Sequence, residues 1–155
     1  MDTREVYLTQ EGFEKFTKEL EDLTTNGRKK IAEMIRTAKE YGDLSENSEY
    51  ADAKDQQVFI EGRIAELEHI LKNVSIIDDT HSNCSVVNMG CSVNVEVNKG
   101  EREFKIVGSA EADPEKDWIS NESPIGKALL GKKTGEVIEV EIPAGKIQYK
   151  INKIK

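Results

Sequence analysis

Two carboxylates, Asp43 and Glu46, lie three residues apart in the short polar segment 42–47. The segment is too short for anything but a reversal of the chain, so both side chains are expected at a turn. Carboxylate oxygens are hard donors that suit Mg²⁺, but this chain alone offers too few ligands for a tight site. Spacing alone favours a structural role, in which the acids satisfy free N–H groups and the dipole at a helix start.

The other side chains with reactive or metal-binding groups do not form a recognisable site. Cys84 and Cys91 are too few for a disulfide framework and have no partners at zinc-ligand spacing, so we interpret both as reduced structural thiols. His69 and His81 lack a neighbouring ligand or triad partner, which favours surface or packing roles. The segment 131–135 lacks the spacing of a phosphate-binding loop and is typical of a turn. Nothing in the sequence indicates nucleophilic catalysis.

The charge and the apolar content of the chain disfavour nucleic-acid-wrapping proteins and membrane proteins. The 155 residues carry 22 basic and 30 acidic side chains, a net charge of -8, which disfavours a protein that wraps nucleic acid by neutralising phosphates. The acid is concentrated in residues 1–78, which hold 18 acidic and 11 basic side chains, so any contact with RNA must be local. Because no apolar run could span a bilayer and residues 1–5 lack a signal peptide's apolar core, we expect a cytoplasmic protein without membrane contact.

The first half has the period of helices that pack against each other, in two stretches separated by residues 42–47. The apolar positions of the first stretch are Phe13, Phe16, Leu20, Leu23, Ile31, Ile35 and Ala38. The second stretch has a heptad seam, with steps of three and four, whose residues are all apolar except Gln57: Tyr50, Ala53, Gln57, Ile60, Ile64, Leu67, Leu71 and Val74. The phase of the first stretch shifts near Gly27, whereas Gly42 suits a helix end and Ser45 an N-cap. The pattern predicts an antiparallel helical hairpin over residues 1–77, with a break near Gly27.

The second half alternates apolar and polar residues, which is the period of strands with one buried face. The alternating apolar residues are Val93, Val95, Val97, Ile138, Val140, Ile142, Ile147, Tyr149 and Ile151. A short helix is bracketed by Ser123 at its N-cap, Pro124 at its first position and Gly131 after its end. Residues 78–155 are therefore predicted to form a small α+β domain, which makes the whole chain α+β.

The turn and the second helix resemble a known family. Residues 41–50 (YGDLSENSEY), 54–57 (KDQQ) and 61–64 (EGRI) resemble the GreA/GreB family of transcript cleavage factors almost residue for residue. The segments that look like the family's C-terminal domain are 106–108 (IVG), 111–113 (EAD), 119–120 (IS) and 123–131 (SPIGKALLG). The resemblance covers nearly the whole chain, is greatest to GreA, and implies a coiled-coil hairpin followed by an FKBP-like domain.

The resemblance also implies a function. The chain would be a transcription elongation factor and not itself an enzyme. Its FKBP-like domain would dock on the rim of the secondary channel of bacterial RNA polymerase, and its hairpin would enter the channel. There it would stimulate the polymerase's own cleavage of backtracked RNA. The factor would act as a monomer, bind no cofactor tightly, and share Mg²⁺ with the polymerase active site.

Residue roles follow from the same resemblance. Asp43 and Glu46 match the family's tip acids, which implies that Asp43 is the main additional Mg²⁺ ligand. Glu46 would help to hold the metal or position the attacking water. Two-metal hydrolysis uses one ion to activate water and another to stabilise the leaving oxygen, so a carboxylate delivered from outside can raise the occupancy of a weakly held ion. Ser123, Pro124 and Ile125 are the candidate polymerase-binding residues.

Basic residues beside the turn have two interpretations. Lys39 and Lys54 resemble the family's basic patch and would hold phosphates of the RNA 3′ segment, or they pair with acids four residues away. Residues 28–30 lie farther from the turn and are interpreted as a solvated charge cluster. The chain departs from the GreA pattern at Ser45, where many members have Lys or Arg, and at residues 24–27, where a Pro-containing stretch is usual.

Three other functions compete with this interpretation. An inhibitory Gre homologue would occupy the same channel, but such proteins carry a more crowded acidic tip than the two acids found here. An FKBP-like isomerase or chaperone needs an aromatic-lined pocket, whereas residues 79–155 contain only Phe104, Trp118 and Tyr149 as aromatic residues. A purely structural coiled-coil adaptor explains the apolar period of the helices but not the turn.

Overall fold

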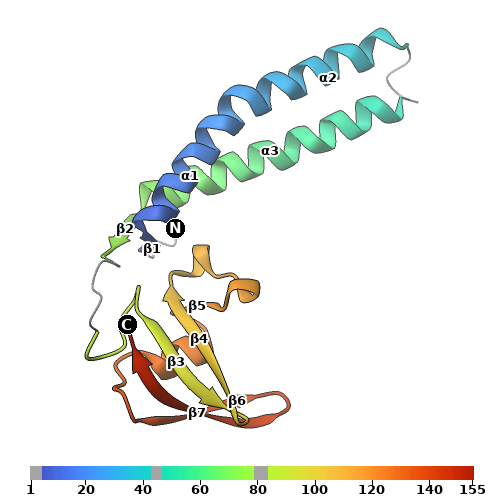
Figure 1. The fold of residues 1–155 in the computed structure, drawn as a ribbon. Coiled ribbons are helices and arrows are strands. Elements are labelled where there is room, and N and C mark those ends of the chain that lie inside the picture. The colour runs from blue at the N-terminus through green and yellow to red at the C-terminus, as the bar shows by residue number, and fades with distance from the viewer. Residues whose placement is uncertain (1–4, 43–46, 79–83) are drawn as a thin grey trace. The chain divides into compact units, whose positions relative to one another are not determined.

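The computed structural model describes residues 5–42, 47–78 and 84–155, which form two compact units (Figure 1). One unit is Glu14–Lys72, and the other combines Met1–Phe13 with Asn73–Lys155. The predicted α+β class is confirmed, because the first unit is helical and the second is built on β-sheet. Within the described ranges, no helix is long and apolar enough to cross a membrane.

The helical unit is a hairpin of two arms that lie side by side (Figure 1). The first arm consists of α1 (Gln10–Asp22), the π-helix η1 (Leu23–Gly27) and α2 (Arg28–Glu40), and the second is α3 (Ser48–Lys72). The buried apolar residues of the arms are Phe16, Ile31, Ala38, Ala53, Ile64, Leu67 and Ile70. All but Ile70 belong to the predicted apolar period. The inclusion of Val74 in that period is wrong, because α3 ends at Lys72 and Val74 begins a strand.

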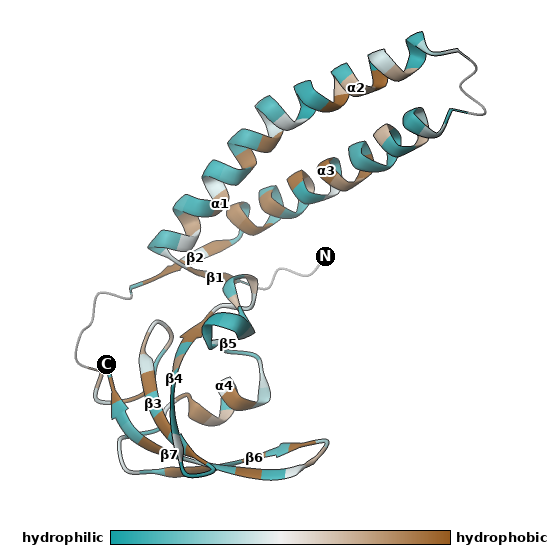
Figure 2. Ribbon diagram, turned by 45° about the vertical axis from the view of Figure 1, so that its right-hand side comes forward, coloured by the Kyte–Doolittle hydropathy of each residue, from teal (hydrophilic) through white to brown (hydrophobic). Residues whose placement is uncertain are grey.

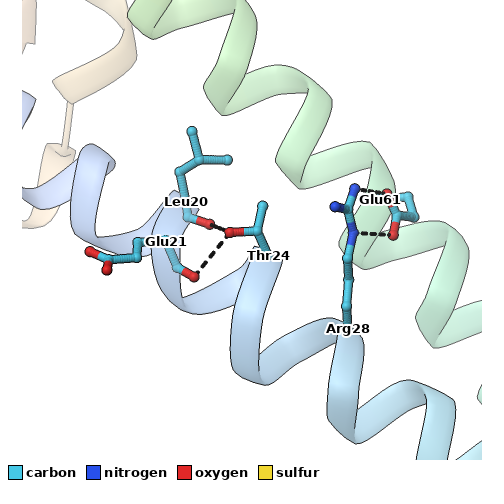
Figure 3. Close-up of polar contacts among 5 residues, drawn as sticks. All are labelled: Leu20, Glu21, Thr24, Arg28 and Glu61. Carbon is cyan, nitrogen blue, oxygen red and sulfur yellow. Dashed lines mark hydrogen bonds and ion pairs between the residues drawn. The ribbon is translucent and has the colours of Figure 1, made fainter.

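The predicted break near Gly27 is confirmed as a π-helical turn. Leu23 and Ile31 are eight residues apart, one more than the seven that return to the same face after two α-helical turns. A π-helical hydrogen bond takes up the extra residue, because the Arg28 N–H donates to the Leu23 carbonyl five residues earlier. Thr24 Oγ1 donates to the carbonyls of Leu20 and Glu21 at 2.8 and 3.0 Å, where the α-helical ladder is interrupted (Figure 3). Both parts of the arm thereby keep their apolar side toward α3.

Arg63 ties α1 to α3. Its Nε and Nη2 donate to the carboxylate of Glu19 at 2.7 and 3.0 Å, and its Nη1 donates to Glu66 at 2.9 Å. The guanidinium also lies over the ring of Phe16, 5.8 Å from the centroid. The hydrogen bond to the Glu19 carboxylate raises the pKa of Arg63 above its ordinary value. Arg63, which lies in the family-like segment 61–64, therefore stabilises the hairpin.

The segments just before and just after the hairpin in the chain form a two-stranded parallel sheet. This sheet was not predicted. Strand β1 (Val6–Thr9) pairs with β2 (Val74–Ile77), so the hairpin is the crossover connection that a parallel pair requires. Both strands belong to the unit that contains the C-terminal sheet. The division into residues 1–77 and 78–155 stays a prediction, and the structure adds that a cut there separates β1 and β2 from the rest of their unit.

Glu111 fastens the end of β1 to the C-terminal part of this unit. Its carboxylate accepts hydrogen bonds from the N–H and the hydroxyl of Thr9, both at 2.6 Å. The Thr9 hydroxyl oxygen in turn accepts the N–H of Gly12 at 3.0 Å, which caps the first turn of α1. A Cβ at Gly12 would lie 2.1 Å from the Glu111 carboxylate, so a larger residue there would push this carboxylate out of its contact with Thr9.

The C-terminal sheet has five strands in the order β5-β4-β3-β7-β6. The strands are β3 (Ser92–Val97), β4 (Gly100–Val107), β5 (Trp118–Ser120), β6 (Val137–Ile142) and β7 (Gly145–Ile154). They are antiparallel except for the β4–β5 pair, and Asn98 and Lys99, both at positive φ, make the tight β3–β4 turn. The 3₁₀ turns η2 (Ser109–Glu111) and η3 (Pro114–Lys116) connect β4 to β5.

The sheet curls around the helix α4 (Pro124–Leu129), and the core lies between them (Figure 2). The fully buried members of this core are Val87, Val93, Val95, Ile106, Leu129 and Ile151. The alternation in 93–97, 138–142 and 147–151 is confirmed, since its apolar residues face this core. The short helix is also as predicted, with Ser123 as the N-cap and Gly131 at a φ of +79° after its end.

Cys84 and Cys91 form a disulfide, so the prediction of two reduced thiols is wrong. Their Cα atoms are 6.6 Å apart across only seven residues of sequence. The chain reverses between them, with the Cys91 N–H donating to the Asn88 carbonyl at 3.2 Å, while Val87 is buried in the core. A count of cysteines cannot reveal such a reversal, which brings the two sulfurs together.

Reducing this disulfide should lower the stability of the protein. The crosslink removes conformational entropy from the unfolded chain, and a loop of this length is worth about 2 to 3 kcal/mol of unfolding free energy. We expect a reductant to lower the denaturant midpoint of the parent but not that of Cys84→Ser, with loss of secondary structure as the readout. Free thiols in the unreduced protein, or equal midpoints with and without reductant, would contradict the crosslink.

Candidate functional site

The segment 43–46, which the sequence predicts to be an acidic turn, links the end of α2 to the start of α3 along the chain. Asp43 and Glu46 lie outside the residues that the structure describes, as does Ser45. The segment that leads into the turn is described: α2 ends at Glu40, and Gly42 adopts a φ of +117°, the left-handed conformation that ends helices at glycine. Tyr41 between them has 75% of its surface exposed.

The residue after the turn, Asn47, bonds to both helices. Its Oδ1 accepts the N–H of Tyr50 at 3.1 Å, which is the N-cap contact of α3. Its Nδ2 donates to the carbonyl of Ala38, near the end of α2, at 2.6 Å. The prediction that Ser45 is the N-cap is therefore wrong, because α3 begins at Ser48 and Asn47 makes the cap contact.

The two lysines predicted to bind RNA lie on different helices near the turn, and both are exposed. Lys39 is in the last turn of α2, where a positive charge interacts favourably with the helix dipole. Lys54 Nζ donates to the amide oxygen of Gln57 at 2.8 Å. The structural alternative predicted from the sequence was an ion pair with an acid four residues away. The observed partner, Gln57, is neutral and three residues away.

The basic cluster 28–30 includes an ion pair across the hairpin. Arg28 Nε and Nη2 donate to the two carboxylate oxygens of Glu61 at 2.8 and 2.7 Å (Figure 3). This hydrogen bonding raises the pKa of Arg28 and lowers the pKa of Glu61. Both side chains are about half exposed, so the pair adds little stability, and it leaves Arg28 engaged within the hairpin.

The predicted polymerase-binding residues open α4. Ser123 Oγ accepts the N–H of Gly126 at 3.0 Å and donates to the carbonyl of Ser120 at 2.7 Å. Pro124 is exposed at the first helical position, and Ile125 packs partly against the core. The two hydrogen bonds of Ser123 therefore hold this helix start in place. Of the two apolar residues here, Pro124 is more exposed than Ile125.

The metal-binding side chains of the described ranges do not gather into a site. Within the described ranges, no group of three or more His, Cys, Asp or Glu side chains could hold a metal ion. His69 is exposed on α3, and His81 lies outside the described residues. Asp43 and Glu46 carry carboxylates, which are hard donors that suit Mg²⁺, and two carboxylates are fewer ligands than Mg²⁺ takes.

Sequence reasoning missed two residues whose contacts hold the starts of helices, Asn47 at α3 and Glu111 through Thr9 at α1. The residue type of Asn47 indicated a possible N-cap, because Asn is among the best N-cap residues. Choosing Asn47 over Ser45 as the N-cap requires knowing where α3 begins. The residues around Glu111 could not indicate its hydrogen bonds to Thr9, since Thr9 is 102 residues away in the chain. Such a contact can be seen only in the folded structure.

Comparisons with known proteins cover both units of the chain. Residues 6–76 match the family model "Transcription elongation factor, N-terminal", and residues 81–155 match "Transcription elongation factor, GreA/GreB, C-term". The chain is 55% identical to the transcription elongation factor GreA of Caldanaerobacter subterraneus subsp. tengcongensis over 99% of both chains. It is 50% identical to GreA of Acetivibrio thermocellus, covering 98% of this chain and 97% of the relative. Among solved structures, GreA factor homolog 1 of Thermus thermophilus is 31% identical, with 98% and 99% coverage and a TM-score of 0.42.

Proposed function

Because this chain belongs to the GreA/GreB family of transcription elongation factors, we propose that it stimulates RNA cleavage by a backtracked bacterial RNA polymerase. The supporting observation is the position of Asp43 and Glu46 in the sequence, between two helix ends that close the far end of a hairpin. The hairpin enters the secondary channel and brings these carboxylates to the polymerase active centre. The protein itself is not a nuclease.

The metal chemistry is divided between the two proteins. Mg²⁺ supplies activation of water and stabilisation of the leaving oxygen when it is held in the polymerase active centre. Asp43 contributes a carboxylate ligand, and Glu46 assists by holding the metal or orienting the attacking water. The chain binds no cofactor tightly, because two carboxylates leave most Mg²⁺ ligand positions to the polymerase.

Docking is assigned to the C-terminal unit. Ser123, Pro124 and Ile125 contact the rim of the secondary channel, which suits their place at a rigid and partly exposed helix start. The protein works as a monomer in the cytoplasm. This division keeps the docking surface remote in sequence from the acidic turn, so binding and cleavage can be altered separately.

Cleavage of arrested transcripts tests the function directly. Purified protein is added to a homologous polymerase stalled on backtracked RNA, and the released fragments are sequenced. We expect faster release of short fragments that contain the RNA 3′ end, and renewed elongation of the shortened transcript. Slower elongation without release of fragments would instead assign the chain to inhibition of the channel.

Replacing both Lys39 and Lys54 by Ala should weaken engagement of the RNA 3′ segment while changing the maximal cleavage rate little. The lysines contribute phosphate contacts, so the concentration of protein that gives half-maximal cleavage should rise, and the rise should differ between low and high salt. The measurement is a titration of protein at two ionic strengths. A variant with the same salt profile as the parent would show that both lysines are structural.

A further inference from the structure

A short strap, residues 84–91, holds the chain just after α4. Val87 near its middle is fully buried in the core between the C-terminal sheet and α4. The N–H of Val87 donates to the carbonyl of Lys132 at 2.8 Å, and its carbonyl accepts the N–H of Gly131 at 2.8 Å. Both partners directly follow the C-cap of α4. The strap therefore fixes the end of the helix whose start is the proposed docking surface.

The disulfide between Cys84 and Cys91 closes the strap at its two ends. Cys91 is 4% exposed, and its carbonyl accepts the N–H of Ile106 in β4 at 3.0 Å, so this end is fixed to the sheet without its sulfur. Cys84 is half-buried at the margin of the core. Because a crosslink acts by removing conformational freedom, a strap without the disulfide opens more often than a closed one.

The two sulfurs differ in how solvent reaches them, and this decides how the bond is broken. A thiolate from a dithiol reductant attacks the half-buried Cys84 sulfur, and the buried Cys91 sulfur leaves and takes up a proton. The second thiol of the reductant then releases Cys84 as a thiol, so the protein gains two electrons and two protons and the reductant becomes a disulfide. Hydrogen peroxide reverses the change, because it oxidises both thiols to the disulfide and is reduced to water.

We propose that the Cys84–Cys91 disulfide is a redox switch, which steadies α4 when it is oxidised and lowers the affinity for RNA polymerase when it is reduced. This inference rests on the proposed function, in which the start of α4 docks on polymerase in the cytoplasm. Disulfides of cytoplasmic proteins are usually transient and serve catalysis or redox sensing. An open strap leaves the end of α4 less ordered, and binding must then supply the free energy of ordering it.

Hydrogen exchange tests the effect on the strap. The amides of Val87 and Gly131 are compared in three forms: the disulfide form, the protein reduced with a dithiol and then freed of reductant, and Cys84→Ser. We expect both amides to exchange about tenfold faster in the last two forms, because their hydrogen bonds join the strap to the chain after α4. The Ile151 amide, which donates to the Glu136 carbonyl at 2.8 Å in the sheet, should accelerate less. Equal acceleration of all three amides, or of none, would overturn the switch.

Titration of each form in the cleavage assay tests the effect on docking, with a polymerase that is never exposed to reductant. The reduced protein and Cys84→Ser should need about fivefold more protein than the disulfide form for half-maximal cleavage, with the same maximal rate. Peroxide should restore the reduced parent but not Cys84→Ser. Ser85→Ala is the matched control: it changes an exposed residue of the same strap but keeps both cysteines, so it should behave as the parent in both redox states.

The same titration separates failure of the switch from failure of the proposed function. If every form stimulates cleavage at the same half-maximal concentration, the proposed function stands and the switch is wrong. If no form stimulates cleavage or binds polymerase, the proposed function is wrong, and the control of docking by this disulfide is wrong with it.

Discussion

Replacing Asp43 by Asn should reduce stimulated RNA cleavage by about 100-fold, which corresponds to about 2.7 kcal/mol of transition-state stabilisation at roughly 1.36 kcal/mol per decade. Asn keeps the size and much of the hydrogen bonding of Asp but removes the charge that binds Mg²⁺. Binding to polymerase should survive, because the C-terminal unit and the buried apolar residues of the hairpin are unchanged. The readouts are the cleavage rate at saturating protein and the affinity for polymerase.

The structure separates a metal-binding role of Asp43 from a helix-capping role. A capping role for Asp43 would predict normal cleavage at saturation and at most about 1 kcal/mol lost from hairpin stability. The cap of α3 is Asn47, four residues after Asp43, so the substitution leaves the cap contact in place. Glu46→Gln should have the same effect as Asp43→Asn but smaller, as expected of a supporting residue. Full stimulation by Asp43→Asn would contradict the role assigned to the turn.

Gly108→Ala should strongly destabilise the unit that contains the C-terminal sheet. A Cβ at position 108 would lie 1.8 Å from the carbonyl oxygen of Tyr7, a backbone atom that cannot turn away. Strand β1 would have to move, which would also weaken the contact of Thr9 with Glu111. We expect a loss of about 3 kcal/mol or more in unfolding free energy, measured by denaturant titration.

Gly62→Ala is the matched control for this substitution. Gly62 lies inside α3, and a Cβ there would meet nothing within 4 Å. The added methyl group should stabilise the protein by roughly 0.5 to 1 kcal/mol, because alanine restricts the unfolded chain and favours helix. Equal stability of Gly108→Ala and the parent would show that β1 does not pack against Gly108 as described.

Local patterns predicted the elements of the fold, but not how distant segments join. The three- and four-residue spacing in 50–71 and the alternation in 138–142 are set by which side chains are buried, so the sequence shows them directly. Strand β1 has only four residues and runs into α1 without a break, so it leaves no pattern of its own. Its pairing with β2 joins residues 68 positions apart, from Val6↔Val74 onward.

The candidate site was predictable to a similar extent. The acids at 43 and 46 were recognised by resemblance, since acids at a helix start are otherwise ordinary. The exact start of α3 decided which polar residue caps it, and a sequence with both Ser45 and Asn47 offers two candidates. Interactions between the arms, such as Asn47 with Ala38 and Arg63 with Glu19, depend on how the helices pack and have no signature along the chain.

The Mg²⁺ dependence of cleavage by arrested polymerase tests the central claim most directly. The rate is measured across a range of Mg²⁺ concentrations for polymerase alone, with saturating parent protein, and with saturating Asp43→Asn. The parent should lower the half-saturating Mg²⁺ concentration, and Asp43→Asn should return it toward the value of polymerase alone. If the parent accelerates cleavage with no change in half-saturating Mg²⁺, or if Asp43→Asn lowers it equally, Asp43 does not supply a metal ligand.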